Sequence, residues 1–280
     1  MSEAEGLEDK SKATRHAGRI LGRVLAFKER LRAGETVIGA WLTFTDPVAA
    51  EILGRNGFDF LIVDTEHGGA WDLQQVQAML MALNGSDTVP IVRVPWNDQV
   101  RIKQMLDLGV EGILAPMVST LEECRALVAA CRYPPDGRRG VGPRRASNYY
   151  RQTQDYMAVA NQAIFIMPQI ENIAVVDNFL DEYLSVPGID AVAIGPNDMS
   201  GTAGVFPNRK HPRIVAAVDK ICRAGAAKGI PVCLGVNTPA EEQREWVEKG
   251  VRLLTVTGDL DLVVSGSRDA LKATRDALAG

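Results

Sequence analysis

Short apolar runs alternate with longer amphipathic stretches from residue 37 to the carboxyl terminus. Eight runs rich in Val, Ile and Leu are typical of buried parallel strands: Val37–Trp41, Phe60–Val63, Val89–Val94, Gly112–Ala115, Ile164–Ile170, Ala191–Ile194, Ile230–Leu234 and Leu253–Val256. The stretches between them predict helices near residues 47–56, 72–84, 98–108, 120–131, 172–184, 213–228, 239–249 and 260–278.

Local signals mark several helix ends. Ser119 with Glu122 resembles a capping box, and Thr238-Pro239 with Glu241 combines a cap, a proline in the first turn and a reciprocal acid. Glycines stand where helices should stop, at Gly57, Gly85, Gly109, Gly229 and Gly250.

Eight strands that alternate with eight helices predict an α/β protein formed by a single (β/α)₈ TIM barrel. A doubly wound sheet is the alternative, but its usual G-x-G-x-x-G turn is missing after the first strand. We place a partly helical amino-terminal extension at residues 1–34, with a helix near Gly22 to Arg32, and the barrel domain at residues 35–280.

Composition excludes several classes of protein. Hydrophobic residues make up 46% of the 280 residues and charged residues 24%, which is typical of a soluble globular domain. The net charge of −4 and the pI near 5.5 argue against a nucleic-acid partner, and no apolar run is long enough to span a membrane. The four cysteines lack metal-site spacing, so we expect buried thiols in a cytoplasmic protein.

Charged and polar side chains follow four of the predicted strands. Asp64, Glu66 and His67 end the second strand, and Arg93 ends the third. The sequence Gln169-Ile170-Glu171 ends the fifth strand, and Asp198 follows the sixth. Carboxyl ends of barrel strands meet on one face, where active sites lie, so we expect one site there. The alternative is that Arg93 only pairs with Glu66 and that Asp198 only caps a helix.

The residue types in this group suggest metal-assisted chemistry on a 2-oxo acid. Glu171 and Asp198 supply hard oxygen ligands, which suit Mg²⁺ or Mn²⁺ better than a closed zinc site. A metal held there would stabilise an enolate, whose oxygen Arg93 could contact, while His67, oriented by Asp64, would act as the acid or base. A lysine Schiff base is disfavoured, because the candidate lysines fall in helices or polar turns.

The longest irregular stretch runs from Tyr133 to about Tyr150 and carries four arginines. Long loops inside compact barrels are usually functional or disordered. We therefore expect this loop to cap an anionic site and to favour an acidic acceptor aldehyde, although a solvated basic loop explains the sequence as well.

In combination, several motifs resemble the metal-dependent pyruvate aldolases of the HpcH/HpaI family, which includes hydroxy-oxo-heptanedioate aldolase and 2-dehydro-3-deoxy-glucarate aldolase. The resemblance runs from about Gly39 to the carboxyl terminus and rests on Gly39-Ala40-Trp41-Leu42, Asp64-Thr65-Glu66-His67, Val92-Arg93-Val94-Pro95-Trp96-Asn97-Asp98, Tyr133-Pro134-Pro135, Gly140-Val141-Gly142, Gln169-Ile170-Glu171 and Gly195-Pro196-Asn197-Asp198. The motifs Asp64-Thr65-Glu66-His67-Gly68 and Arg93-Val94-Pro95 also resemble those of macrophomate synthase. The segment between Gly142 and Arg145 is shorter than is typical of the family, which leaves the aldehyde open.

The resemblance implies a role for each matching residue. It implies metal at Glu171 and Asp198, with Glu66 in contact with metal-bound water, and a base formed by His67 with Asp64. It implies substrate binding by Arg93, Gln169, Trp41 and Pro196. It also implies a divalent cofactor (Mg²⁺ or Mn²⁺, with Co²⁺ as a further option) and a homo-oligomer, often a hexamer or trimer of dimers whose carboxyl-terminal helix packs on a neighbour.

We therefore predict a lyase that reversibly cleaves 4-hydroxy-2-oxo acids into pyruvate and an aldehyde through a metal-stabilised pyruvate enolate. Oxaloacetate decarboxylation, or enolate trapping as in macrophomate synthase, is the alternative within the same chemistry. A non-catalytic protein that binds metal and 2-oxo acids, and a coenzyme A ester lyase, are less favoured by the sequence.

Overall fold

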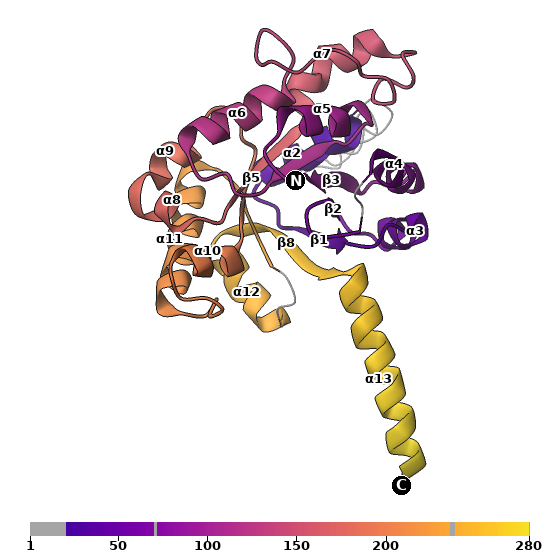
Figure 1. The fold of residues 1–280 in the computed structure, drawn as a ribbon, viewed down its shortest axis with the longest axis vertical. Coiled ribbons are helices and arrows are strands. Elements are labelled where there is room, and N and C mark those ends of the chain that lie inside the picture. The colour runs from indigo at the N-terminus through magenta and orange to yellow at the C-terminus, as the bar shows by residue number, and fades with distance from the viewer. Residues whose placement is uncertain (1–20, 70–71, 236–238, 280) are drawn as a thin grey trace, which may run out of the picture.

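The eight predicted strands form one closed barrel of parallel strands that follow each other in chain order (Figure 1). In this computed structural model, which describes residues 21–69, 72–235 and 239–279, each strand begins and ends within two residues of its predicted run. The strands are β1 (Val37–Leu42), β2 (Phe60–Asp64), β3 (Val89–Arg93), β4 (Gly112–Ala115), β5 (Phe165–Ile170), β6 (Val192–Ile194), β7 (Val232–Leu234) and β8 (Val251–Gly258). The barrel prediction is confirmed, and the doubly wound sheet is excluded.

Helices connect the strands and cover the outside of the barrel, except α2, which precedes β1, and α13, which follows β8 (Figure 1). They are α2 (Gly22–Arg32), α3 (Pro47–Arg55), α4 (Leu73–Ala82), α5 (Gln99–Asp107), α6 (Leu121–Cys131), α7 (Thr153–Ala163), α8 (Ile173–Asn178), α9 (Leu180–Leu184), α10 (Pro196–Thr202), α11 (Pro212–Lys228), α12 (Ala240–Glu248) and α13 (Asp259–Ala279). The sequence did not predict α7 or α10. The single helix expected over residues 172–184 is divided into α8 and α9 at Phe179, whose φ of −154° is not helical.

The local signals at helix ends had mixed outcomes. All five predicted stop glycines adopt positive φ, from 68° at Gly229 to 107° at Gly250, as a left-handed helix end requires. The start of α6 is one residue later than predicted, because the Thr120 hydroxyl, not that of Ser119, accepts the amide N–H of Glu123. The proposed cap at Thr238 lies outside the described residues.

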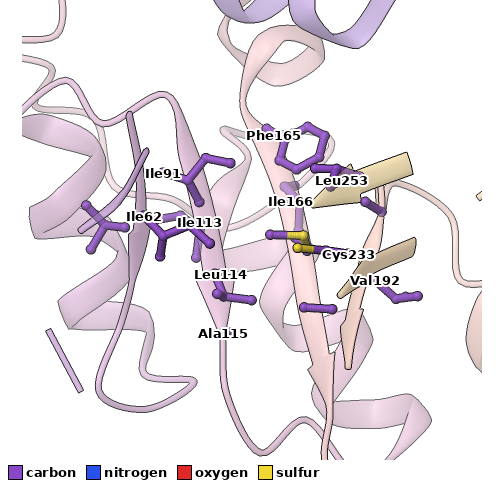
Figure 2. Packing of buried hydrophobic residues seen from close by; sticks show 14 of the residues in the cluster. Ile62, Ile91, Ile113, Leu114, Ala115, Phe165, Ile166, Val192, Cys233 and Leu253 are labelled. Atoms are coloured by element: carbon purple, nitrogen blue, oxygen red, sulfur yellow. The ribbon is translucent and has the colours of Figure 1, made fainter. Parts of the chain in front are cut away.

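Apolar side chains from seven of the eight strands meet in the core that Figure 2 shows. The residues labelled there are Ile62, Ile91, Ile113, Leu114, Ala115, Phe165, Ile166, Val192, Cys233 and Leu253, and all are buried. The four cysteines are free and buried, as expected for small core residues. Within the described ranges, no helix is long and apolar enough to cross a membrane.

Helix α2 closes the amino-terminal end of the barrel. Its Phe27 ring packs edge-on against Phe60 and Phe165, the first residues of β2 and β5, with centroid distances of 5.8 and 5.3 Å. Lys28 is buried beside it and pairs with Asp190 at 2.7 Å. Burial lowers the pKa of Lys28, and Asp190 opposes that effect. This closure leaves the carboxyl-terminal end of the strands as the open face.

Helix α13 extends away from the barrel and carries the carboxyl terminus at its tip (Figure 1). Of its described residues only Asp259, the first, is buried. Several large apolar side chains along it are exposed, at Leu260, Leu262, Val263, Val264, Leu271 and Leu278.

Candidate active site

The open end of the barrel holds a cavity of about 970 Å³. Seven of the nine predicted site residues line it, namely Trp41, Asp64, His67, Arg93, Gln169, Pro196 and Asp198. The remaining two, Glu66 and Glu171, interact electrostatically with Asp198 and Arg93. The barrel therefore brings together the side chains that the sequence placed at separate strand ends.

Arg93 is the best anchored cation in this group. The parallel register of β2 and β3 places it opposite Asp64, and its Nε and Nη2 atoms donate to the two Asp64 oxygens at 2.8 and 2.7 Å. Its Nη1 atom lies 3.2 Å from Glu66, and the guanidinium stands 4.5 Å from the ring centroid of Trp41. This bidentate, stacked arrangement fixes the direction of the guanidinium, which a lysine could not reproduce.

Asp64 has a different partner from the one predicted. Both of its oxygens bind Arg93, and its Oδ1 atom also accepts the backbone N–H groups of Glu66 and His67. The His67 ring instead has its Nε2 atom 3.8 Å from Glu66, and 72% of the His67 side chain is exposed. Asp64 therefore holds the backbone at the start of the His67 loop, rather than its ring.

Glu171, like Asp64, is a buried carboxylate of the site, with only 3% of the residue exposed. Burial raises its pKa to about 7, Asp198 and Glu66 add to that effect, and the Met117 N–H, which donates to Oε2 at 2.7 Å, opposes it. Met117 reaches this position with a φ of 53°, in the left-handed region. A cation beside Glu171 would stabilise its ionised form and offset the effect of burial.

Gly195 makes room for this carboxylate. A Cβ atom at Gly195 would lie 2.5 Å from Cγ and Oε1 of Glu171 and 3.0 Å from Nε2 of Gln169. Glycine is therefore the only residue that lets the β6 end approach the β5 end this closely. Sequence reasoning did not assign roles to Gly195 or Met117. The position of Gly195 directly after a strand could have indicated its role. Met117 acts through its backbone N–H, which every residue except proline has, so its side chain gives no signal in the sequence.

Glu66 and Asp198 complete the acidic part of the site. Burial raises the pKa of Glu66, Asp64 and Asp198 act in the same direction, and Arg93 and His67 oppose them. Asp198 lies in the first turn of α10, directly after β6. With Asp64, four carboxylates lie around one arginine, so acidic groups outnumber cations in this site.

This donor set fits a hard divalent cation. Glu171 and Asp198 offer carboxylate oxygens, and the nearby Gln169 Oε1 atom is buried without a hydrogen-bond partner in the described structure. Across residues 21–69, 72–235 and 239–279, no three His, Cys, Asp or Glu side chains form a ready metal-binding group. A cation at this place would have Glu171 and Asp198 as candidate carboxylate ligands, with its other positions open to water and substrate.

The loop of residues 133–150, which carries four arginines, does not lie over the site as the sequence predicted. The Arg139 side chain is fully buried, donates to Asp107 and Tyr156, and stacks 4.4 Å from the ring centroid of Tyr133. Arg145 donates to the Leu108 carbonyl. Asp107 and Leu108 lie at the end of α5, just before β4 begins, and therefore at the amino-terminal end of the barrel, opposite the open face. None of residues 133–150 lines the cavity, so within one chain the predicted cap over the anionic site is wrong; aromatic stacking and an ion pair hold Arg139 elsewhere.

Lysines at the outer part of the cavity are paired with acids. Lys210 lies 2.9 Å from Glu242, and Lys249 lies 2.9 Å from Asp219. A Schiff base needs a desolvated, unpaired amine, so this arrangement agrees with the sequence argument against that route.

Comparison with known proteins agrees with this geometry. Residues 37–265 match the model of the HpcH/HpaI aldolase/citrate lyase family. The chain is 37% identical over 243 residues to 5-keto-4-deoxy-D-glucarate aldolase of Escherichia coli, a match that covers 86% of this chain and 93% of that protein.

Solved structures extend the match to three dimensions. An HpcH/HpaI aldolase/citrate lyase family protein from Burkholderia cenocepacia J2315 has a TM-score of 0.84 at 30% identity, over 89% of this chain and 99% of that one. Macrophomate synthase has a TM-score of 0.78 at 28% identity, over 92% and 91% of the two chains. With the barrel and its mouth as described, the sequence resemblance is confirmed: the chain belongs to the HpcH/HpaI aldolase/citrate lyase family and is a carbon–carbon lyase.

Proposed function

We propose that this lyase is a divalent-metal-dependent aldolase that cleaves 4-hydroxy-2-oxo acids reversibly into pyruvate and an aldehyde. The observation that carries the proposal is the gathering of Glu66, Glu171 and Asp198 near Arg93, with the pKa of Glu171 raised to about 7. The E. coli relative is named for cleavage of 5-keto-4-deoxy-D-glucarate, which makes that sugar acid the first substrate to test.

Glu171 and Asp198 would hold the cation, Mg²⁺ or Mn²⁺ by the hardness of their oxygens, with Co²⁺ as an alternative. When bound, the cation supplies Lewis-acid polarisation of the 2-oxo acid. Glu66, close to both Arg93 and Asp198, would accept hydrogen bonds from water in this site.

The remaining residues bind the substrate and move the proton. Arg93 directs its guanidinium at the oxygen that becomes negative as the carbon–carbon bond breaks. Trp41, under that guanidinium, and Pro196 form walls of the cavity, and Gln169 lies against the same space. His67, exposed at the mouth, acts as acid and base, directly or through one water. Asp64 positions Arg93 and the backbone of the His67 loop.

Exchange of the pyruvate methyl hydrogens in D₂O, followed by NMR, tests this proposal without a choice of aldehyde. We expect exchange with Mn²⁺ or Mg²⁺ and none with EDTA. His67→Ala should slow both exchange and cleavage by about 100-fold or more, while Mn²⁺ affinity is kept, as expected of a general base. Near-normal exchange in His67→Ala, or none in the metal-loaded wild type, would refute the assignment.

Decarboxylation of oxaloacetate is the second candidate, because macrophomate synthase is among the structural relatives. It would generate the same enolate by loss of CO₂ rather than by loss of a proton or an aldehyde. Metal-dependent CO₂ release from oxaloacetate, without methyl exchange in pyruvate and without cleavage of the sugar acid, would favour it over the aldolase.

We also propose that the enzyme works as a cytoplasmic homo-oligomer, a hexamer or trimer of dimers, in which α13 packs on a neighbouring copy. The exposed apolar residues of α13 support this, since water-facing Leu and Val at helical spacing normally have a partner. Light scattering should give a multiple of the 30.3 kDa chain mass, and Leu271→Glu should reduce it. A monomeric wild type would contradict the proposal.

A further inference from the structure

Asp259, the first residue of α13, accepts hydrogen bonds from the turn that follows β1. Asp259 is 5% exposed, and its carboxylate accepts four hydrogen bonds. Its Oδ1 atom accepts the Thr43 N–H at 2.9 Å, the Thr43 hydroxyl at 2.6 Å and the Leu260 N–H at 2.8 Å, and its Oδ2 atom accepts the Phe44 N–H at 2.9 Å. Two segments more than 200 residues apart in sequence are thus joined by one buried side chain.

The same turn holds the end of the His67 loop. The Thr43 carbonyl accepts the Gly69 N–H at 2.7 Å. A Cβ atom at Gly68 would lie 2.4 Å from the Asp64 carbonyl and 3.2 Å from the Thr43 carbonyl, and a Cβ atom at Gly69 would lie 3.0 Å from Thr45. A side chain at Gly68 would therefore collide with the Asp64 carbonyl, and it would also press tightly against the Thr43 carbonyl.

These contacts fix the loop at both ends. Asp64 accepts the backbone N–H groups of Glu66 and His67 at its start, and Thr43 holds Gly69 at its end. The exposed His67 ring has few contacts of its own, so its position depends on the backbone between these two anchors.

We infer that Asp259 is a positioning residue for the active site: through Thr43 it sets the place of Gly68-Gly69 and hence of His67. This inference rests on the proposed role of His67 as acid and base. It assigns a function to the one buried residue of α13, the helix that the assembly proposal places on a neighbouring copy.

Asp259→Asn tests it with little change in shape. The Asn amide can replace only one oxygen as an acceptor, so its NH₂ group must face either the Phe44 N–H or the Thr43 donors. Exposed Asp269 lies farther along α13, and Asp269→Asn is the matched control. We expect Asp259→Asn to lower kcat for sugar-acid cleavage by about tenfold or more, with KM and Mn²⁺ affinity within twofold, and Asp269→Asn to match wild type. Equal kcat in Asp259→Asn and wild type would overturn the inference.

A double-mutant comparison separates positioning from general damage. If Asp259 acts through His67, Asp259→Asn should cause no further loss of kcat in a His67→Ala background. Losses that multiply would refute the inference. Light scattering and circular dichroism should show that the compared variants share the wild-type assembly and fold.

Hydrogen exchange gives a readout that does not depend on activity. A peptide that covers residues 64–69 should exchange faster in Asp259→Asn than in wild type and at the wild-type rate in Asp269→Asn. If His67→Ala cleaves normally, the proposed function fails, yet this exchange result still decides whether Asp259 holds the loop. Unchanged protection in Asp259→Asn would refute that part of the inference.

Discussion

Glu171→Gln should make the metal-free enzyme more stable while it abolishes activity. The carboxyl is buried, and its pKa is raised from 4.5 to about 7, chiefly by that burial. An amide of nearly the same shape keeps an oxygen for the Met117 N–H and carries no charge. The substitution thus removes the free-energy cost of burying the charged Glu171 carboxylate, and it removes one proposed metal ligand at the same time.

The magnitude follows from the two pKa values. Between pH 4.5 and 7 the folded chain holds a proton that the unfolded chain has released, so the free energy of unfolding falls as pH rises through this window. The contribution of protonated Glu171 to the free energy of unfolding is fully present below pH 4.5. By pH 8, wild type has lost about 3 kcal/mol, which the neutral amide does not lose. For a chain of this size, that corresponds to roughly 6 °C in Tm.

Urea unfolding at fixed protein concentration in EDTA, at pH 5 and pH 8, measures this difference. We expect Glu171→Gln to exceed wild type by about 3 kcal/mol at pH 8 and by less than about 1 kcal/mol at pH 5. Exposed Glu182 offers the control Glu182→Gln, which should show no such pH dependence. Added Mn²⁺ should stabilise wild type and not Glu171→Gln. A variant no more stable than wild type at pH 8 would refute the reasoning.

Three further substitutions test other parts of the structure. Gly195→Ala should lower Mn²⁺ affinity by at least about tenfold, because its Cβ would displace Glu171, whereas Gly201→Ala has open space around it and should not; equal calorimetric affinities would contradict this. Arg93→Lys should lower kcat by about 100-fold, because one ammonium cannot hold Asp64 bidentately and also reach Glu66; a wild-type rate at saturating substrate would count against the role of Arg93. Phe27→Ala should cost about 3 to 5 kcal/mol in urea unfolding and leave kcat unchanged, and a cost below about 1 kcal/mol would show that α2 does not seal the barrel.

The barrel itself was predictable from sequence because its signals are local. Buried parallel strands appear as unbroken apolar runs, and stop glycines adopt the positive φ that only glycine tolerates easily. Helix α7 was missed because it follows a long irregular loop and Gln152 provides no side-chain cap. The break at Phe179 was missed because it interrupts an otherwise helical pattern.

The sequence predicted which residues lie in the site, but not which of them bond to each other. Strand ends placed Asp64, Arg93 and Glu171 on one face, but the choice of Arg93 over His67 as the partner of Asp64 depends on the register between β2 and β3. Arg139 was misjudged for a related reason. The sequence predicted that the loop arginines would cap an anionic site, with a solvated loop as the alternative, but the burial of Arg139 depends on Tyr156 and Asp107, which lie in other segments of the chain.

The seal formed by α2 also sets an order of events during synthesis. The helix leaves the ribosome before any strand of the barrel, yet Lys28 bonds to the carbonyl of Gln162, 134 positions later, and Phe27 rests on Phe165. At translation speeds of about 5 to 20 residues per second, its apolar face waits on the order of ten seconds for these partners. Until β5 has been made, the nascent chain can cover Phe27 with Phe60 of β2 but not with Phe165, so part of this ring stays exposed, and a chaperone that shields it would act before the barrel can close.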